Sequence, residues 1–255
     1  QAVVRAIEER LSSERGEAQA RLAMAAAAAE RDAKTRLIAA ASHDLQQPLQ
    51  AASLFFESAV ESRDPAVRDR SIAGARRAFV STQALIGQML DHLRLEAGAV
   101  TARVEPVALG PLIAAVVADQ APAALAEGIR LHAVSSSQSV KADPTLLGRA
   151  LSNLVANAIR HSQGRRALIG VRRDSEAVTL WVIDDGRGVG ARADTRLFED
   201  FAHGAAVTAG SREGFGLGLA SARRSLALMG GAAGLERPWR GGSAFYLRLP
   251  REGLP

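Results

Sequence analysis

The distribution of glycine and proline divides this chain into two parts that must fold differently. Residues 1–98 hold four of the 23 glycines, and Pro48 is the single proline between Gln1 and Asp64. Alanine, leucine, glutamate and arginine dominate this part, which is typical of long helices. After residue 98 glycine becomes frequent, and helical stripes alternate with strand-like runs. We therefore expect a helical N-terminal part followed by an α+β part.

Two apolar stripes predict an antiparallel helical hairpin. The pattern breaks at Arg63–Pro65, where Pro65 can begin a new helix, and Glu96–Gly98 ends that helix. A lone pair of helices leaves one apolar face uncovered, whereas two hairpins in a four-helix bundle cover it, so we expect a homodimer. The stripes consist of Leu37, Ala41, Leu45, Pro48, Ala52, Phe55/Phe56 and Ala59, and of Ile72, Ala75, Phe79, Thr82, Leu85/Ile86, Met89 and Leu93.

Composition excludes several classes of protein. With 47% hydrophobic and 23% charged residues, the chain is not a disordered one. The lack of cysteine excludes thiolate catalysis and is typical of a reducing compartment, so we expect a cytoplasmic location. The net charge of +5 is too small and dispersed to favour nucleic acid. The longest apolar run, Leu22–Ala29, is too short to span a membrane, so no membrane segment is expected in this fragment.

A helix expected over residues 144–161 carries the first candidate site. Asp143 and Pro144 supply an N-cap and a first-turn proline. An asparagine amide oxygen is a ligand suited to Mg²⁺, and arginine is suited to phosphate. The alternative is that these polar residues simply form the solvent-facing side of an amphipathic helix. The polar side holds Asn153, Asn157 and Arg160, and the expected buried face consists of Leu147, Leu151, Leu154, Val155 and Ala158.

Two glycine-rich segments follow. A β-branched strand runs into Asp184, whose carboxylate could accept a hydrogen bond from an adenine amino group, and glycines then let backbone approach a ligand. A hairpin turn is the alternative for this segment. The second segment precedes a helical stripe, and a glycine loop at a helix N-terminus is suited to phosphate. The glycines are Gly186, Gly188 and Gly190 in the first segment, and Gly214, Gly216 and Gly218 in the second.

The order of these motifs resembles the Bergerat-type ATPases, which include histidine kinases, gyrase, Hsp90 and MutL. It covers about residues 107–250 and includes a phenylalanine-containing segment at Leu197–Phe201. The resemblance implies an α/β sandwich with ATP between its helices and a lid in residues 189–213. Asp185 stands where the family most often has asparagine. The resemblance implies that Asn157 is the Mg²⁺ ligand and that Asn153 is its companion on the phosphate side. Arg160 occupies the usual basic position, and His161 the frequent aromatic position beside the nucleotide. It also implies that Asp184 is the carboxylate that contacts adenine, that Gly186 and Gly188 shape its loop, and that Gly214, Gly216 and Gly218 form the phosphate loop.

Residues 41–49 resemble the phospho-acceptor box of sensor histidine kinases, in the form His43-Asp44-Leu45-Gln46-Gln47-Pro48-Leu49. Helical geometry separately places His43 opposite the apolar stripe, where a neutral imidazole can act as a nucleophile. Asp44 can hydrogen-bond one ring nitrogen. Family members use an amide at the position of Gln47 to orient water, so phosphatase activity is a second hypothesis. His92 and His132 are expected to be ordinary surface residues.

We therefore expect the core of a two-component sensor histidine kinase. It would use ATP and Mg²⁺ to phosphorylate His43 and then pass the phosphoryl group to an aspartate of a response-regulator receiver domain. A nucleotide-binding pseudokinase acting as a dimeric signalling scaffold is the alternative; a DNA-repair or chaperone ATPase lacks support. The expected domains are a signalling helix from a missing sensor (1–35), a dimerisation and phosphotransfer domain (36–98), a linker (99–106) and an ATP-binding domain (107–255).

Overall fold

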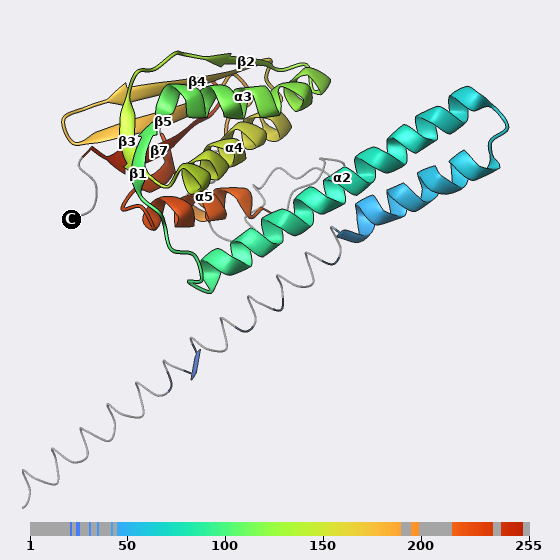
Figure 1. Ribbon diagram of the computed structural model, residues 1–255, viewed down its shortest axis with the longest axis horizontal. Helices are drawn as coiled ribbons and strands as arrows, with labels where there is room; N and C mark the ends of the chain where they lie inside the picture. The colour runs from blue at the N-terminus through green and yellow to red at the C-terminus, as the bar shows by residue number, and fades with distance from the viewer. Residues whose placement is uncertain are drawn as a thin grey trace, which may run out of the picture. The chain divides into compact units, whose positions relative to one another are not determined.

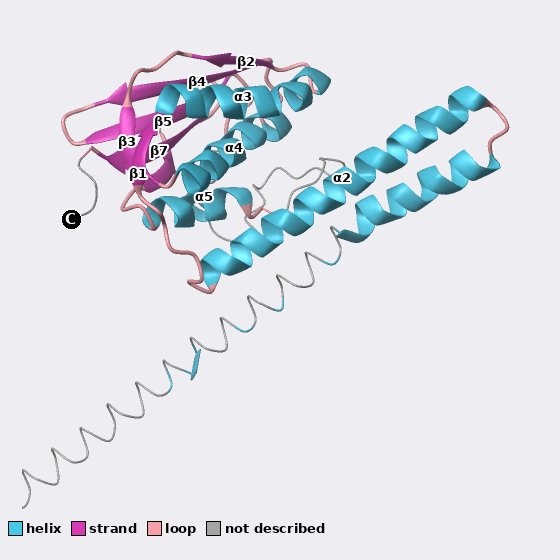
Figure 2. Ribbon diagram, in the orientation of Figure 1, coloured by secondary structure: helices cyan, strands magenta, loops and turns pink. Residues whose placement is uncertain are grey.

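The computed structural model describes most of the chain (Figures 1 and 2). It divides into two compact units, residues 1–75 and 76–255, with the boundary inside helix α2 (Pro65–Glu96). The described residues are 45–189, 195–198, 216–236 and 241–251, together with Arg21, Met24, Ala25, Arg31, Thr35 and Ser42.

A helical hairpin forms where the two apolar stripes predict it. Residues 45–61 are helical and belong to the first helix, which ends at residue 61, and α2 begins at Pro65. Between them, Asp64 Oδ1 accepts the backbone N–H of Ala66 at 2.8 Å, which caps the second helix. α2 ends at Glu96, and Gly98 follows with a φ of 63°. The turn and the helix end expected from the sequence are therefore confirmed.

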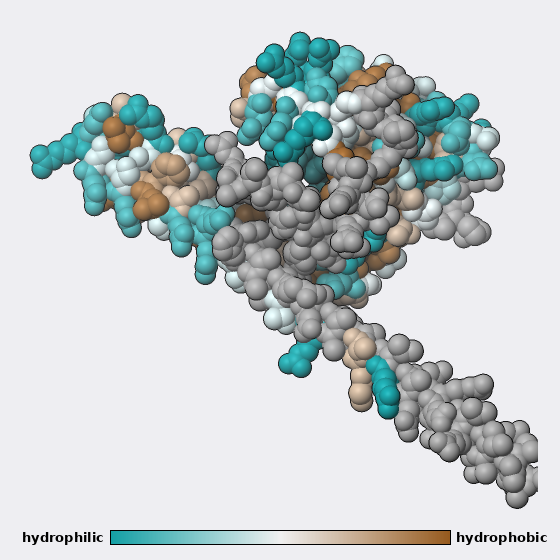
Figure 3. Space-filling view, turned by 180° about the vertical axis from the view of Figure 1, so that it is seen from behind, coloured by the Kyte–Doolittle hydropathy of each residue, from teal (hydrophilic) through white to brown (hydrophobic). Residues whose placement is uncertain are grey.

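Each stripe of the hairpin contains a buried part and an exposed part. In the first unit Ala52 and Ala59 are buried, and the ring of Phe55 lies so close to Gly74 that a Cβ there would be 2.7 Å from it. Large apolar side chains nevertheless remain exposed on both helices, and Figure 3 shows apolar surface on the hairpin. They are Leu49, Leu54, Phe55, Phe56, Val60, Ile72, Phe79, Val80, Ile86 and Leu90.

The second unit contains a two-layer α/β sandwich, which confirms the expected fold class. Helices α3, α4 and α5 cover one face of a five-stranded sheet with the order β2-β4-β5-β7-β6, and β1 pairs with β3 in a separate ribbon (Figure 1). The elements are β1 (Glu105–Ala108), α3 (Leu109–Ala126), β2 (Arg130–Ala133), β3 (Ser139–Ala142), α4 (Pro144–His161), β4 (Arg166–Arg173), β5 (Ala177–Asp184), the 3₁₀ helix η1 (Thr195–Phe198), α5 (Gly218–Ala227), β6 (Ala232–Leu235) and β7 (Ala244–Pro250).

Strand register places Asp184 at a junction of three segments. β2 runs parallel to β4, and the other neighbouring strands of the large sheet are antiparallel. Asp184, the last residue of β5, pairs with Ala167 near the start of β4. Its neighbour Ile183 pairs with Ala244, the first residue of β7. The end of β5 therefore lies between the beginnings of β4 and β7.

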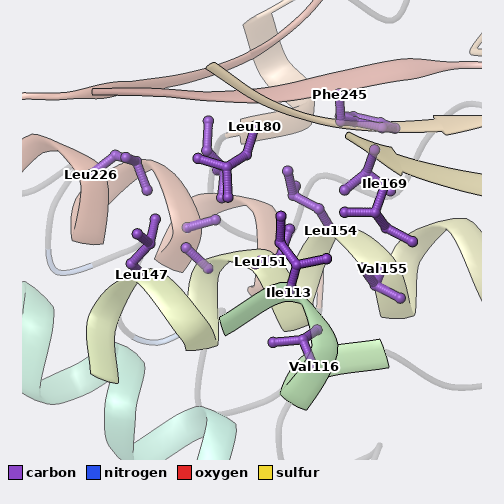
Figure 4. Packing of buried hydrophobic residues seen from close by; sticks show 14 of the residues in the cluster. Ile113, Val116, Leu147, Leu151, Leu154, Val155, Ile169, Leu180, Leu226 and Phe245 are labelled. Carbon is purple, nitrogen blue, oxygen red and sulfur yellow. The ribbon is translucent and has the colours of Figure 1, made fainter. Parts of the chain in front are cut away.

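The core lies between the helices and the sheet, where side chains of α3, α4 and α5 meet those of β4, β5 and β7 (Figure 4). The expected buried face of α4 is confirmed, because its five apolar residues are all buried. Phe198 of η1 joins this core, with its ring centroid 6.3 Å from that of Phe245. Three short strands, β1, β3 and β6, were not anticipated, and β1 includes Glu105 and Pro106 of the expected linker.

Among the described residues one helix, α3, is long and apolar enough to cross a membrane by length and composition. Its Leu109, Ile113, Val116 and Ala124 are buried in the core of the sandwich.

Candidate functional site

Helix α4 carries most of the predicted site, and Asp143 holds its first turn. Asp143 Oδ1 accepts the backbone N–H groups of Thr145 (2.9 Å) and Leu146 (3.0 Å), which confirms the expected N-cap. Its Oδ2 accepts the N–H of Arg103 at 2.8 Å. Burial by itself would raise the pKa of Asp143, but these three N–H groups and the Arg103 charge hold the pKa below its ordinary value.

The polar side of α4 faces away from the core as expected. Asn153 and Asn157 are half-buried, and Arg160 and His161 are exposed. Asn153 Nδ2 donates a hydrogen bond to the carbonyl oxygen of Gly218, the first residue of α5, at 3.1 Å. This bond joins the middle of α4 to a helix N-terminus, where backbone N–H groups and the helix dipole favour an anion.

Asp184 is a buried acceptor at the end of β5, only 3% exposed. Its Oδ1 accepts the backbone N–H groups of Gly186 (3.0 Å) and Ser243 (3.2 Å). Burial raises the pKa of Asp184, although hydrogen bonds from Gly186 and Ser243 oppose that rise. Because an ionised carboxylate offers about four acceptor positions, two backbone donors leave capacity for a ligand amino group.

Glycines allow three backbone segments to meet around Asp184. A side chain on Gly186 would overlap the carbonyl oxygen of Ser162, and one on Gly242 would overlap the carbonyl oxygen of Asp184. Gly188 has a φ of 71°, and a Cβ there would lie 2.6 Å from the carbonyl oxygen of Gly242. Only glycine fits such approaches, so the close backbone contacts around Asp184 explain these glycines.

The other predicted residues are distributed as follows. Gly216 lies two residues before α5 with a φ of 64°. Gln47 is exposed on the helix of residues 45–61. Gly214, His43 and Asp44 lie outside the described residues. The structure thus brings Asn153 to Gly218, and Asp184 to Gly186.

Comparison with known families decides the identity of this arrangement. Residues 33–98 match the His Kinase A (phospho-acceptor) domain, and residues 142–253 match the histidine kinase-, DNA gyrase B-, and HSP90-like ATPase family. This chain is the catalytic core of a histidine kinase. His43 falls in the first matched range, and every predicted ATP-site residue falls in the second. Because the second family is one of ATPases, residues 142–253 of this kinase core form an ATP-binding domain.

Individual relatives agree with this assignment. The sensor protein KdpD of Escherichia coli (strain K12) is 31% identical over 256 residues, covering 97% of this kinase core and 27% of KdpD. The sensor protein kinase PmrB of Pseudomonas aeruginosa is 29% identical over 222 residues, covering 86% of the core and 46% of PmrB. The core therefore spans less than half the length of either relative. The crystal structure of full-length ShkA in complex with AMPPNP shares the fold, with a TM-score of 0.62 and 24% identity over 86% of the core and 46% of that chain.

Sequence reasoning missed three residues that shape this site in the kinase core. Gly164 and Gly242 have no room for side chains beside the Asp184 segment, and Ser243 both donates to Asp184 Oδ1 and accepts its backbone N–H at 2.9 Å. The Gly241-Gly242-Ser243 run before the last strand is a turn signal, and a turn signal does not say which distant strand end it meets.

One expectation about histidines is wrong. His92 is 1% exposed, and its Nδ1 and Nε2 lie 3.0 and 3.1 Å from Nη1 of Arg224. The neighbouring Asp91 pairs with Arg149 at 2.7 Å. These contacts, all within residues 76–255, bury a side chain that was expected at the surface. His132 is exposed, as expected.

Proposed function

We propose that this kinase core transfers the γ-phosphoryl group of ATP to His43 and then to an aspartate of a response-regulator receiver domain. The observation that carries the proposal is the combination in one chain of a phospho-acceptor region containing His43 with a buried carboxylate, Asp184, inside an ATPase fold. In the transfer, a ring nitrogen of His43 bonds to the γ-phosphorus while the bond to the β–γ bridging oxygen breaks and ADP leaves. Asp44 accepts the N–H of the other ring nitrogen and sets the tautomer.

The nucleotide site is proposed to use the residues predicted for it. Asp184 accepts a hydrogen bond from the adenine amino group. The phosphates lie toward Asn153 and the glycines Gly214, Gly216 and Gly218, whose N–H groups favour negative charge. Arg160 and His161, in the last turn of α4, would flank the nucleotide.

Asn157 is the proposed protein ligand of Mg²⁺. Its amide oxygen is the hard type of ligand that Mg²⁺ prefers, and it is half-buried on the polar side of α4. Among the described residues no group of three or more acidic, histidine or cysteine side chains could hold a metal, so nucleotide phosphates would supply the other ligands. Bound Mg²⁺ would stabilise the charge on the transferring phosphoryl group.

Homodimerisation through the hairpin is supported by its uncovered apolar residues. Positions 49, 56 and 60 lie within about 40° of one another at 100° per residue, and so do positions 72, 79, 86 and 90. All seven are exposed leucine, isoleucine, valine or phenylalanine residues. Pairing of two hairpins would cover these stripes in a four-helix bundle. The exposed Gln47 is available to orient water, which supports phosphatase activity toward the partner as a second part of the proposal.

The proposed domains are a signalling helix (1–35), the dimerisation and phosphotransfer domain (36–98), a linker (99–106) and the ATP-binding domain (107–255). The matched phospho-acceptor range of 33–98 supports the second. We place the core in the cytoplasm, where its substrate ATP is found.

Incubation with γ-labelled ATP and Mg²⁺ tests the function, with wild type compared to His43→Gln. We expect acid-labile, base-stable label on wild type and none on the variant, because the amide lacks a nucleophilic ring nitrogen. Binding of unlabelled ATP should be equal in both, which controls for folding. Absence of label on a wild type that binds ATP would favour a pseudokinase, and label on the variant would show that another residue accepts phosphate.

A further inference from the structure

A second carboxylate, Asp185, holds the loop between α4 and β4. Asp185 Oδ1 accepts the backbone N–H groups of Arg165 (2.7 Å) and Arg166 (2.8 Å). The backbone N–H of Asp185 donates in return to the carbonyl oxygen of Arg166 at 3.2 Å. Its Oδ2 lies 3.7 Å from Nε of Arg166. One side chain therefore joins the end of β5 to the loop that follows the nucleotide helix.

The loop held by Asp185 has an unfavourable backbone. Gln163 has a φ of 55°, the one positive φ of a non-glycine residue in the described part of the chain. Ser162 stabilises the same turn, since its Oγ accepts the N–H of Gly164 at 3.0 Å and its carbonyl oxygen accepts the N–H of Arg187 at 2.9 Å. A strained turn persists only where surrounding contacts hold it in place, and Asp185 accepts two of the shortest hydrogen bonds of this loop.

The loop and the Asp184 segment are in direct backbone contact. A side chain on Gly164 would overlap Oδ1 of Asp185, and a Cβ there would lie 2.8 Å from the backbone nitrogen of Gly186. With no side chain between them, a shift of the loop displaces Gly186, which donates to Oδ1 of Asp184. The loop is also the direct continuation of the last turn of α4, which carries Arg160 and His161.

We propose that Asp185 is a positioning residue for adenine. Asp185 couples the end of α4 to Asp184 and so sets the preference of this core for ATP over GTP. This inference rests on the proposed role of Asp184 as the residue that contacts adenine. Asp185 itself needs no contact with the nucleotide, because it acts through the loop and through Gly186. Asparagine retains the oxygen that accepts both N–H groups, so it should serve almost as well at this position.

The antiparallel pair of strands β4 and β5 offers a matched control at the end opposite Asp185. Asp174 Oδ1 accepts the backbone N–H groups of Glu176 (2.9 Å) and Ala177 (2.7 Å), and its Oδ2 lies 3.6 Å from Nη2 of Arg248. Asp174 follows β4 and Asp185 follows β5, so the two carboxylates make the same type of contact at opposite ends of the β4–β5 pair. Loss of Asp174 should affect stability without reaching the nucleotide.

The experiment measures dissociation constants for ATP and GTP by calorimetry, together with melting temperatures, in the whole chain. We expect Asp185→Ala to weaken ATP binding about tenfold or more and to reduce the ATP-over-GTP ratio, because two charge-assisted hydrogen bonds are lost. Asp185→Asn should restore the affinity to within about threefold. Asp174→Ala should lower the melting temperature but leave both dissociation constants unchanged.

Two outcomes would overturn the inference: Asp185→Ala binding ATP as well as Asp174→Ala does, or Asp185→Asn binding as weakly as Asp185→Ala. If Asp185→Ala does not fold, Asp185→Glu replaces it, because its longer side chain keeps the charge and displaces the loop. Wild-type affinity from Asp185→Glu would contradict the proposal. A wild type that fails to bind ATP, or an Asp184→Asn variant that binds ATP normally, would instead overturn the proposed function.

Discussion

Asp184 combines poor conditions for a charge with good conditions for a ligand. It is buried at the end of β5, and burial raises its pKa although Gly186 and Ser243 donate hydrogen bonds to it. A carboxyl that must ionise in such a place lowers the free energy of unfolding at neutral pH. Such residues are kept where function requires them, so removal of the charge should change stability and ligand binding in opposite directions.

The substitution Asp184→Asn should separate these two effects. The amide oxygen can still accept both backbone N–H groups, but it is a weaker acceptor for an adenine amino group. At pH 7 we expect a melting temperature equal to or above that of wild type, and ATP binding at least about tenfold weaker. Thermal unfolding and calorimetric titration measure the two quantities.

The pH dependence of this comparison has a definite sign. Because the folded-state pKa of Asp184 is raised, its contribution to stability is fully present below the ordinary value of 3.8 and is lost as the pH rises through the folded value. The stability advantage of Asp184→Asn should therefore grow between about pH 4 and pH 7. An advantage that shrinks over this range would contradict the raised pKa.

At the scale of elements, α4 depends on the cap at its first residue. Asp143→Ala removes the acceptor for Thr145, Leu146 and Arg103, and we expect a loss of about 1–2 kcal/mol in the free energy of unfolding. Chemical denaturation measures the loss. Asp119→Ala on α3 is the control, because the exposed Asp119 bonds only to its neighbour Gln120 among the described contacts.

Acid should abolish the difference between Asp143→Ala and wild type. The folded-state pKa of Asp143 is lowered, so its contribution is present above 3.8 and is lost as the pH falls through the folded value. The two denaturation curves should converge as the pH falls below about 4. A constant difference down to pH 2 would argue that the loss comes from side-chain packing instead.

Elements differ in how much of them the sequence predicts. α4 was identified correctly because its 18 residues contain several helical periods of an apolar pattern, and β5 because its 8 residues form a nearly continuous apolar run that includes β-branched residues. The strands β1, β3 and β6 have four residues each, as does the anticipated β2, so an apolar pattern in a run this short does not reliably distinguish a strand from a loop. Those strands exist because a partner strand accepts their hydrogen bonds, and pairing is not a local property.

At the scale of the whole molecule, the uncovered stripes of the hairpin predict its oligomeric state. Phe56 is 64% exposed and Phe79 is 54% exposed in the single chain. Burial of such a ring in a dimer is worth about 2–3 kcal/mol, so Phe79→Glu or Phe56→Glu should shift the chain from dimer to monomer at micromolar concentration.

Light scattering coupled to size-exclusion chromatography measures this shift. Gln83→Glu adds the same charge at an exposed polar position of α2 and should leave the dimer unchanged. A wild type that is monomeric, or a Phe79→Glu variant that stays dimeric, would contradict the four-helix bundle. Loss of ATP binding by Phe79→Glu would indicate misfolding, because the nucleotide residues belong to the sandwich.

The sequence alone was sufficient for the helical hairpin, the α/β class and the Asp143 cap. These follow from periodicity and local chemistry, which act between residues close in the chain. Only the tertiary structure brought Ser162, Asp184 and Gly242 together and buried His92 beneath Arg224. Such contacts depend on how strands pair and helices pack across long stretches of chain, and no local pattern specifies that packing.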